Sequence, residues 1–341
     1  MSTTPMGITQ FGAFTPSAAQ LIQQAISQAG FGTTGKIFYC DPVNGLDTNN
    51  GQLAAPSGAA GQGPVQSLGA GYALLRSGFN DVLVLIGNGT STASARLAAT
   101  FTWAKNAAHL VGICAPSQIS QRARIAPFTG AAQAAFANFF VVSGNGCLFS
   151  NLSWFHGFTA GVAASICLTV SGTRNAFVNC DIEGMGDATS AADAGSRNIL
   201  ISADENFFYH CNVGLDTVSR TNANASVEVK GGAARNIFEN CTFLFYSGDG
   251  NTLGIYTAAA ASMDRFLLLR NCMFINAVGS AATAMAALAT LTAASGGVVA
   301  MKDCMTVGIT KLGGGVAGTD AQMWVYGQLA AATAYLSTNP S

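Results

Sequence analysis

The sequence is poor in charge. Of its 341 residues, only 9% are Asp, Glu, Lys or Arg, against roughly 25% in an average soluble domain. Its 15 basic and 16 acidic residues leave a net charge of −1, so there is no basic surface for nucleic acid or for an anionic membrane. A protein surface with so few charges is poorly protected against association with other proteins. We therefore expect copies of the chain or a protein partner to cover much of it.

The sequence also lacks the marks of secretion, metal binding and membrane insertion. Its first residues carry no charged segment followed by an apolar one, so we expect synthesis in a cytoplasm. The nine cysteines are odd in number and form no CxxC pair, which predicts reduced thiols. The uncharged stretch from Asn271 to Met301 is long enough to span a bilayer, but its Ala, Thr, Ser and Gly content argues against a membrane helix.

What the sequence does contain is a repeat of about 31 residues. Five cysteines follow one another at intervals of 31, 30, 31 and 32 residues, each inside a pattern such as Phe238-Glu-Asn-Cys-Thr-Phe243. An earlier copy has Leu in place of Cys. The predicted core ladder is therefore Leu152, Cys180, Cys211, Cys241, Cys272 and Cys304.

The alternation within each copy predicts a bend. In a regular strand Phe238, Cys241 and Phe243 could not all point inward. They can do so if Asn240 is one extra residue at a corner between Phe238 and Cys241. Asn suits that place because it tolerates the left-handed region of backbone space. The predicted corner ladder comprises Asn151, Asn179, His210, Asn240, Asn271 and Asp303.

A second strand precedes each corner, as in Ile199-Leu-Ile201 and Val227-Glu-Val229. Short strands recurring in register predict a solenoid, and we infer an all-β, right-handed parallel β-helix of about eight rungs. We place an N-terminal arm and capping helix at residues 1–35, the β-helix at 36–310 and a C-terminal cap at 311–341. The capping helix covers residues 17–29, and the Ala-rich excursion at 279–295 is expected to include a short helix.

Motifs for cofactors and metals are weak. Gly30, Gly32 and Gly35 match a dinucleotide fingerprint, but the motif follows a helix and precedes a strand, which is the wrong order for phosphate binding. The Asp- and Asn-rich run at residues 41–50 lacks the spacing of a calcium loop and predicts a turn held by its own side chains. We predict no cofactor and no bound metal.

Carboxylates for catalysis on polysaccharide are scarce. The local groups are Asp181, Glu183 and Asp187, and Asp204 with Glu205. Asp181 takes an outward position after the corner, but the equivalent positions in other rungs are not acidic, so no paired carboxylates are evident. We predict no catalytic residue, and we expect Trp154 to lie in the core rather than form a sugar platform.

The segment from Ile37 to Gly51, followed by Pro64-Val-Gln-Ser-Leu68 and residues 80–87, resembles the entry segment of pectin-lyase-like β-helix proteins, especially those encoded by tailed bacteriophages. The Asn-Cys rungs look like the same family, so the resemblance covers roughly residues 36 to 310. That family includes polysaccharide lyases and hydrolases, trimeric tailspikes, and capsid cement or decoration proteins that only bind.

The resemblance implies a bacteriophage virion protein, most like a trimeric cement or decoration protein. Such a protein sits on the outer capsid surface and bridges subunits of the major capsid protein, without being an enzyme. Its partners are then its own copies and the major capsid protein, with no nucleic acid and no membrane. The alternative is a tailspike-like polysaccharide depolymerase with its site near Asp181 and Glu183, or a glycan-binding virion protein.

Overall fold

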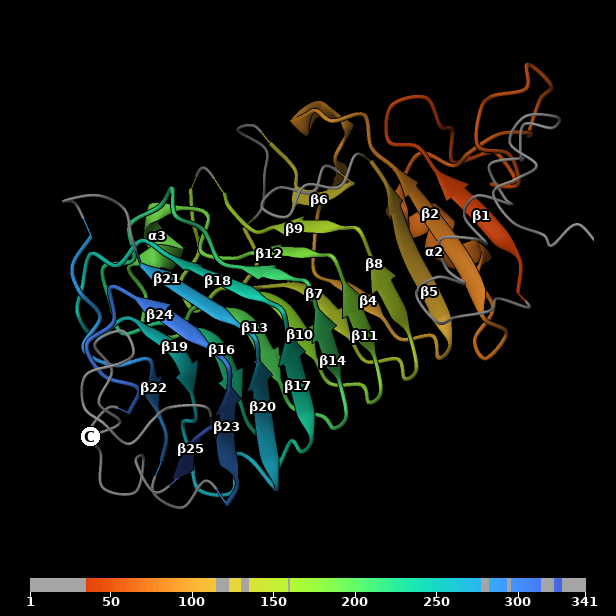
Figure 1. The fold of residues 1–341 in the computed structure, drawn as a ribbon. Helices are drawn as coiled ribbons and strands as arrows, with labels where there is room; N and C mark the ends of the chain where they lie inside the picture. Colours follow the sequence, from red (N-terminus) through yellow and green to blue (C-terminus); the bar gives the residue numbers. More distant parts are fainter. Residues whose placement is uncertain are drawn as a thin grey trace, which may run out of the picture.

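The structure is a computed structural model that describes residues 35–114, 123–129, 135–158, 160–276, 282–292, 296–313 and 322–326. It is an all-β parallel solenoid of about seven turns, against the eight predicted. Figure 1 shows the solenoid, in which the strands of three long sheets are stacked along one axis, from β1 at one end to β22 and β25 at the other. The predicted capping helix at 17–29 and most of the predicted C-terminal cap lie outside the described residues.

Three parallel sheets form the walls of the solenoid. Sheet A has ten strands: β1 (Ile37–Cys40), β2 (Asp81–Ile86), β5 (Ala108–Ile113), β8 (Leu148–Ser150), β11 (Ala176–Val178), β14 (Phe207–Tyr209), β17 (Asn236–Glu239), β20 (Phe266–Arg270), β23 (Val298–Lys302) and β25 (Met323–Tyr326). Sheet B has eight: β3 (Ala95–Leu97), β6 (Arg124–Pro127), β9 (Ser153–Phe155), β12 (Asp181–Glu183), β15 (Asn212–Val213), β18 (Thr242–Phe245), β21 (Met273–Asn276) and β24 (Met305–Val307). Sheet C has seven: β4 (Phe101–Trp103), β7 (Asn138–Val142), β10 (Ile166–Val170), β13 (Arg197–Ile201), β16 (Ala225–Val229), β19 (Leu253–Tyr256) and β22 (Ala289–Thr290).

In each full rung the chain runs from sheet A to sheet B, then through a loop to sheet C and a turn back to sheet A; from β8 onward the connection from A to B is a tight corner. Equivalent residues of successive rungs pair in register, as Phe177 does with Phe208 and Phe208 with Phe238. Because the pairing is parallel, side chains of one kind stack on their own kind along the axis. The fold therefore follows from repeating one path.

The corners between sheets A and B confirm the predicted bend. All six residues of the predicted corner ladder have φ between 51° and 56°, the left-handed region. Asn179 Nδ2 also donates to Asn151 Oδ1 at 3.2 Å. The bend lets the residues on both sides of it face the core: Phe238, Cys241 and Phe243 are all buried.

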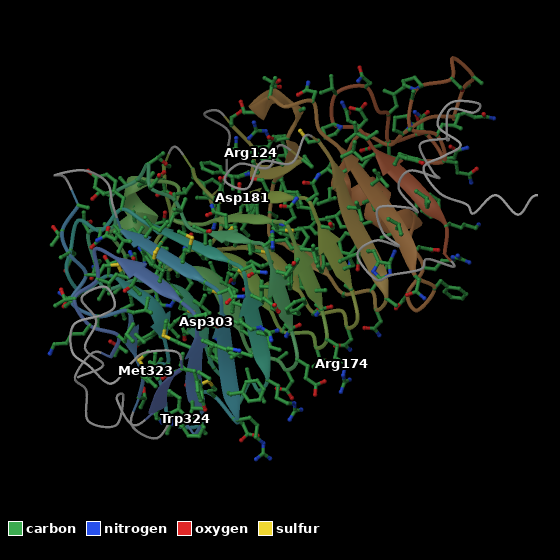
Figure 2. All side chains as sticks on the ribbon, viewed as in Figure 1. Arg124, Arg174, Asp181, Asp303, Met323 and Trp324 are labelled. Carbon is green, nitrogen blue, oxygen red and sulfur yellow. The ribbon has the colours of Figure 1, made fainter. Side chains whose placement is uncertain are left out.

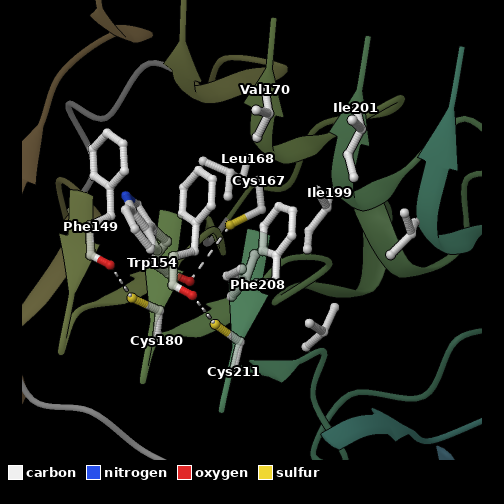
Figure 3. Close-up of a cluster of buried hydrophobic side chains, with 14 of the residues drawn as sticks. Phe149, Trp154, Cys167, Leu168, Val170, Cys180, Ile199, Ile201, Phe208 and Cys211 are labelled. Carbon is white, nitrogen blue, oxygen red and sulfur yellow. Dashed lines mark hydrogen bonds between the residues drawn. The ribbon is translucent and has the colours of Figure 1, made fainter. Parts of the chain in front are cut away.

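The core confirms the predicted cysteine ladder (Figure 3). Each thiol donates to a backbone carbonyl of the preceding rung, as Cys180 does to Phe149 at 3.5 Å and Cys211 to Phe177 at 3.3 Å. Beside the thiols, the rings of Phe177, Phe208 and Phe238 stack at centroid distances of 4.6 and 4.3 Å. The thiols therefore satisfy their hydrogen bonds inside an apolar interior, and none of the nine cysteines is in a disulfide.

A second asparagine ladder was not predicted. Asn175, Asn206 and Asn236 lie buried in the turns between sheets C and A. The amide oxygen of Asn206 accepts from Asn175 N at 3.0 Å, and that of Asn236 from Asn206 N at 2.9 Å. Each stands two residues before a core Phe, and that spacing is the signal in the sequence that identifies it. These side chains satisfy backbone donors that the turn leaves unpaired.

Within the described residues, three short helical segments interrupt the strands: α2 (Leu68–Leu74), α3 (Ala188–Ala191) and the 3-10 turn η2 (Ser91–Ala93). Helix α2 was missed because its two glycines disfavour a helix. The structure needs Gly71, since a Cβ there would lie 2.7 Å from Leu83 Cδ1 of β2. Ser67 begins the helix, its side chain accepting from Ala70 N.

The helix predicted within 279–295 is wrong for the residues described there. Residues 282–292 contain no helix and instead supply β22, the last strand of sheet C. The alanine content favoured a helix, but pairing with β19 determines the structure.

The turn predicted at residues 41–50 is present. The Asp41 carboxylate accepts from Val43 N, Asn44 N and Asn44 Nδ2 at 2.9 to 3.0 Å. Asp47 Oδ1 accepts from Gln66 N and Ser67 N. These oxygens thus hold the entry loop against α2. Of the glycine motif, Gly30 and Gly32 lie outside the described residues.

The left-handed corners generate a prediction. Replacing Asn240 by Ala should lower the free energy of unfolding by about 1 kcal/mol, because Ala tolerates φ of 54° less well than Asn does. Replacing Asn240 by Gly should leave it within about 0.5 kcal/mol, because Gly adopts this conformation freely. Urea titration of the purified variants measures both values. Equal losses in the two variants would contradict a conformational role for the corner.

Candidate functional site

The outward carboxylates of sheet B are buried. Asp181 and Glu183 flank the inward Ile182 on β12, and they are 0% and 9% exposed. Ser153 Oγ donates to Glu183 Oε2 at 3.5 Å. Arg124 of β6 and Asp181 of β12 lie in the same row of sheet B with Ser153 of β9 between them, and Figure 2 labels both at this wall of the solenoid. Carboxyl groups this buried cannot meet a polymer from solvent, so the site considered near Asp181 and Glu183 is closed in this structure.

The other acidic residues named from the sequence have structural contacts. Asp187 caps α3, accepting from Ser190 N at 2.9 Å and from Ser190 Oγ at 2.8 Å. Asp204 Oδ1 accepts from Ala234 N at 2.9 Å. The structure does not bring these groups together with Asp181 into one site.

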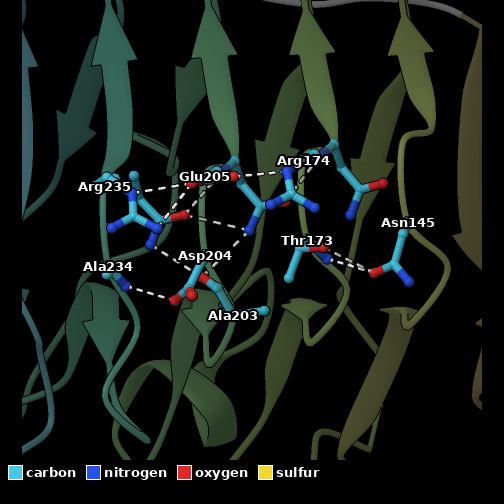
Figure 4. Close-up of polar contacts among 11 residues, drawn as sticks. Asn145, Thr173, Arg174, Ala203, Asp204, Glu205, Ala234 and Arg235 are labelled. Carbon is cyan, nitrogen blue, oxygen red and sulfur yellow. Dashed lines mark hydrogen bonds and ion pairs between the residues drawn. The ribbon is translucent and has the colours of Figure 1, made fainter.

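Glu205 lies at the turn between sheets C and A, between two arginines from neighbouring rungs (Figure 4). It contacts Arg174 at 2.6 Å and Arg235 at 2.8 Å. The hydrogen bond from Arg235, together with the charge of Arg174, lowers the pKa of Glu205. The carboxylate therefore links three rungs at the surface.

A serine and a histidine make a contact that sequence spacing did not reveal. Ser165 Oγ donates to His156 Nδ1 at 3.0 Å, and His156 Nε2 lies 3.2 Å from Phe136 O. The geometry is that of a nucleophile beside a base, but Ser165 is 1% exposed and His156 0%. The His156 ring also stacks on Phe139 at 5.0 Å. Both side chains lie in packed protein, where their role is structural.

One accessible feature of the described residues is a groove on sheet C. Its volume is about 390 Å³, within the range of roughly 300 to 1,000 Å³ that is typical of ligand pockets. Its floor comes from β13, β19 and β22, and its walls from the successive loops between sheets B and C. The lining residues are Ala194, Arg197, Ala223, Gly250, Asn251, Leu253, Tyr256, Ala286, Ala287 and Thr290.

One charged pair is fixed at the floor of this groove. Arg197 Nε contacts Glu228 Oε2 at 2.7 Å, with side-chain exposures of 6% and 15%. Arg197 also donates to the carbonyls of Ala194 and Ser196, and its guanidinium lies 4.9 Å from the centre of the Tyr256 ring. The pair and the ring are therefore held in one orientation before any ligand arrives.

A buried arginine stands behind the groove. Arg220 is 3% exposed and donates to Asn224 Oδ1 at 2.6 Å and to the carbonyls of Asn224 and Leu253 at 2.8 and 3.0 Å. Burial, with a smaller contribution from the charge of Arg197, lowers its pKa to about 9. These bonds tie the loop before β16 to the start of β19. Arg220 thus fixes the two segments that carry Ala223 and Leu253 of the lining.

The sequence analysis missed the groove. Glu228 and Tyr256 lay in recognised strands, and their register on adjacent strands was available from the repeat. The walls were not, because the loops at 184–196, 214–224 and 246–252 share no common length or pattern. Trp154, by contrast, is buried in the core as predicted.

Two further findings concern metals and membranes. Within the described ranges, no three His, Cys, Asp or Glu side chains are grouped so that they could hold a metal ion. In the same ranges, no helix is long and apolar enough to cross a bilayer.

Comparisons with known proteins find the fold and nothing more specific. No protein-family model and no curated protein matches the sequence. A pectin methylesterase variant in complex with a hexasaccharide matches with 12% identity and a TM-score of 0.49, over 87% of this chain and 81% of that chain. Pectin methylesterase PemA from Erwinia chrysanthemi matches with 12% identity and a TM-score of 0.48, over the same shares of the two chains.

These comparisons correct one expectation. The prediction that the chain is not an enzyme is contradicted, because the solved structures it resembles are pectin methylesterases. At 12% identity the likeness concerns the parallel β-helix alone and gives no residue a role. Nothing in the comparisons supports a phage origin or a capsid role.

The buried histidines generate a prediction about pH. Burial lowers the pKa of His156 and of His109 to about 4, below the 6.5 of an unfolded chain. Both are neutral in the folded state near pH 7, and the unfolded chain gains protons first as pH falls. Each of the two histidines should therefore lower the free energy of unfolding by about 2 to 3 kcal/mol as the pH falls from 6.5 to 4.

Urea titrations at pH 7 and at pH 4.5 measure this loss. The His156→Gln variant should lose less stability over that interval than the unmodified protein, whatever its stability at pH 7. His210→Asn, at an exposed corner, is the matched control and should keep the full loss. An unchanged pH dependence in His156→Gln would show that this imidazole is not held neutral.

Proposed function

We propose that the protein acts on a polysaccharide, which it holds in the groove on sheet C. The observation that carries the proposal is the arrangement at the floor of that groove, where Tyr256 lies beside the fixed Arg197–Glu228 pair. A concave site with an aromatic ring and a few oriented polar groups is typical of ligand binding. The described carboxylates on sheet B are buried and offer no comparable surface.

Each lining group has a distinct task with a sugar. The half-buried ring of Tyr256 presents an apolar surface to the C–H face of a pyranose, which needs little desolvation. The exposed amide of Asn251 presents a hydrogen-bond donor to hydroxyl or carboxyl oxygens, while the buried Arg197 holds Glu228 and the Tyr256 ring in place. Asp249 Oδ1 orients Asn251 by accepting from its backbone N and its Nδ2 at 2.8 and 2.9 Å.

The shape of the groove suits a chain rather than a compact ligand. The lining extends over the rungs of β13, β16, β19 and β22, and adjacent strands are about 4.8 Å apart. The floor therefore runs roughly 14 Å along the solenoid axis. A bound polymer would lie along the axis, with successive sugars meeting equivalent positions of successive rungs.

The finer expectations from the resemblance stay predictions. They are the bridging of capsid subunits, the position on an outer capsid surface and the homotrimer. No feature of the described residues favours the bridging role over action on a glycan.

A panel of bacterial surface polysaccharides, assayed for both binding and release of fragments, tests the proposal. Tyr256→Ala should weaken binding of the recognised glycan by about tenfold or more, because it removes a stacking surface worth more than about 1 kcal/mol. Tyr256→Phe, which keeps the ring, should bind within about twofold of the unmodified protein.

The control is Phe79→Ala, an exposed aromatic outside the groove, which should leave binding unchanged. Thermal melting of each variant checks the fold. If glycans bind and Tyr256→Ala binds as well as the unmodified protein, the groove is not the site. If no polysaccharide in a broad panel is bound or cleaved, the proposed function is wrong.

A further inference from the structure

The sequence contains four Asn-Gly pairs, which begin at Asn44, Asn50, Asn88 and Asn145. In such a pair the glycine N can attack the side-chain amide carbon of the asparagine, because a residue without a Cβ leaves that approach open. All four pairs have the same covalent chemistry. They therefore differ in reactivity through the contacts that the fold gives to each.

The attacking N–H is already bonded in three of the pairs. There the glycine N–H donates to a backbone carbonyl of another segment or turn at 2.9 to 3.0 Å: Gly45 to Asp41, Gly51 to Gly63 and Gly146 to Thr173. Gly89 N, by contrast, donates to no atom in the part of the chain that the structure describes. Gly89 is also exposed, and a Cβ added to it would meet nothing within 4 Å. Among the four, Asn88-Gly89 is thus the pair with a free nucleophile.

The asparagine side chains differ in a similar way. Asn145 Oδ1 accepts from Thr173 N and Thr173 Oγ1 of the next rung at 2.7 and 3.1 Å (Figure 4). Asn44 Nδ2 donates to the buried Asp41 at 3.0 Å. Ring closure at either site would break contacts that hold the solenoid or its entry loop.

The Asn88 amide is polarised by its own loop, between β2 and η2. Its Oδ1 accepts from Thr90 N at 3.0 Å and from Thr90 Oγ1 at 2.7 Å. Negative charge develops on this oxygen when the amide carbon is attacked, and two donors that already point at it stabilise that charge. Both donors belong to a residue two positions away, so the reacting atoms can move without breaking a bond to another rung.

We propose that Asn88 deamidates spontaneously in the folded protein, which makes this loop a site of covalent self-modification. Gly89 N loses its proton and bonds to Asn88 Cγ, the bond from Cγ to Nδ2 breaks, and the leaving nitrogen departs as ammonia with that proton. Water then opens the resulting succinimide to aspartate or isoaspartate. Solvent water is the other reactant, and the step involves no oxidation.

The product places a negative charge where the chain has none. No residue from 82 to 180 is Asp or Glu, and the net charge would change from −1 to −2. Arg96 reaches the same loop, since its Nη2 donates to Ser91 O at 3.0 Å, and it forms no ion pair within the described ranges. The new carboxylate therefore meets an unpaired cation in its loop. The loop is not part of the groove lining, so this proposal is independent of the proposed function.

Timed incubation of the folded, full-length protein, followed by peptide mapping with mass spectrometry, tests the proposal. Aspartate and isoaspartate should accumulate at position 88 about tenfold or more faster than at 44, 50 and 145, because those sites react only after local opening. The rate at 88 should rise with pH, since Gly89 N must lose its proton. In concentrated urea, where these contacts are lost, the four sites should react at similar rates.

Asn50 is the matched internal control. Its Oδ1 accepts from Gln52 N at 3.0 Å, as Asn88 accepts from Thr90, but Gly51 N is bonded. In isoelectric focusing, the aged protein should gain a band at the position of the Asn88→Asp variant, and Asn88→Gln should not gain that band. Equal rates at Asn88 and Asn50 in the folded protein would overturn the proposal. So would an unchanged Asn88 in a folded sample under conditions where the urea sample reacts.

Discussion

The constraint on which the rest of the structure depends is in-register stacking of one chain path. From β8 onward, each described rung turns the same corner between sheets A and B, and that corner requires a backbone conformation that few residues adopt readily. Because all six corner residues adopt it, the thiols beside them stack in one column and donate to the rung before. The strand register, the corner conformation and the packing of the core thus depend on one another. A shift in register at one rung would displace the stacked side chains of the neighbouring rungs.

The same constraint decides where the chain is free to vary. From β8 onward, sheets A and B are joined by a tight corner of fixed length, whereas the loops from B to C differ from rung to rung. These loops from sheet B to sheet C form the walls of the groove above sheet C. Its walls still need fixing, and Arg220 fixes them with bonds to backbone and amide oxygens. A buried guanidinium satisfied by neutral oxygens keeps a rigid wall at some cost in desolvation.

What the sequence predicted well was whatever repeats. The corner residues and the thiol column both follow from a spacing of about 31 residues. The groove was missed because its walls, Asn251 among them, come from loops that share no common length or pattern. Helix α2 was missed because Gly71 allows close contact with β2, a tertiary requirement that opposes local propensity. Alanines in residues 282–292 were misread because pairing with β19 overrides propensity there.

The scarcity of charge also limits how the molecule works. Asp81, Asp187, Asp204 and Glu205 hold backbone donors or arginines of the solenoid itself. Such groups cannot be turned to a substrate without loosening a rung. A ligand must then be recognised by apolar surface and by polar groups already held in place, as Tyr256 and Asn251 are. An uncharged polymer with many hydroxyl groups suits these groups better than a compact ion would. Such a polymer needs many weak contacts along the axis, whereas an ion needs one strong counter-charge.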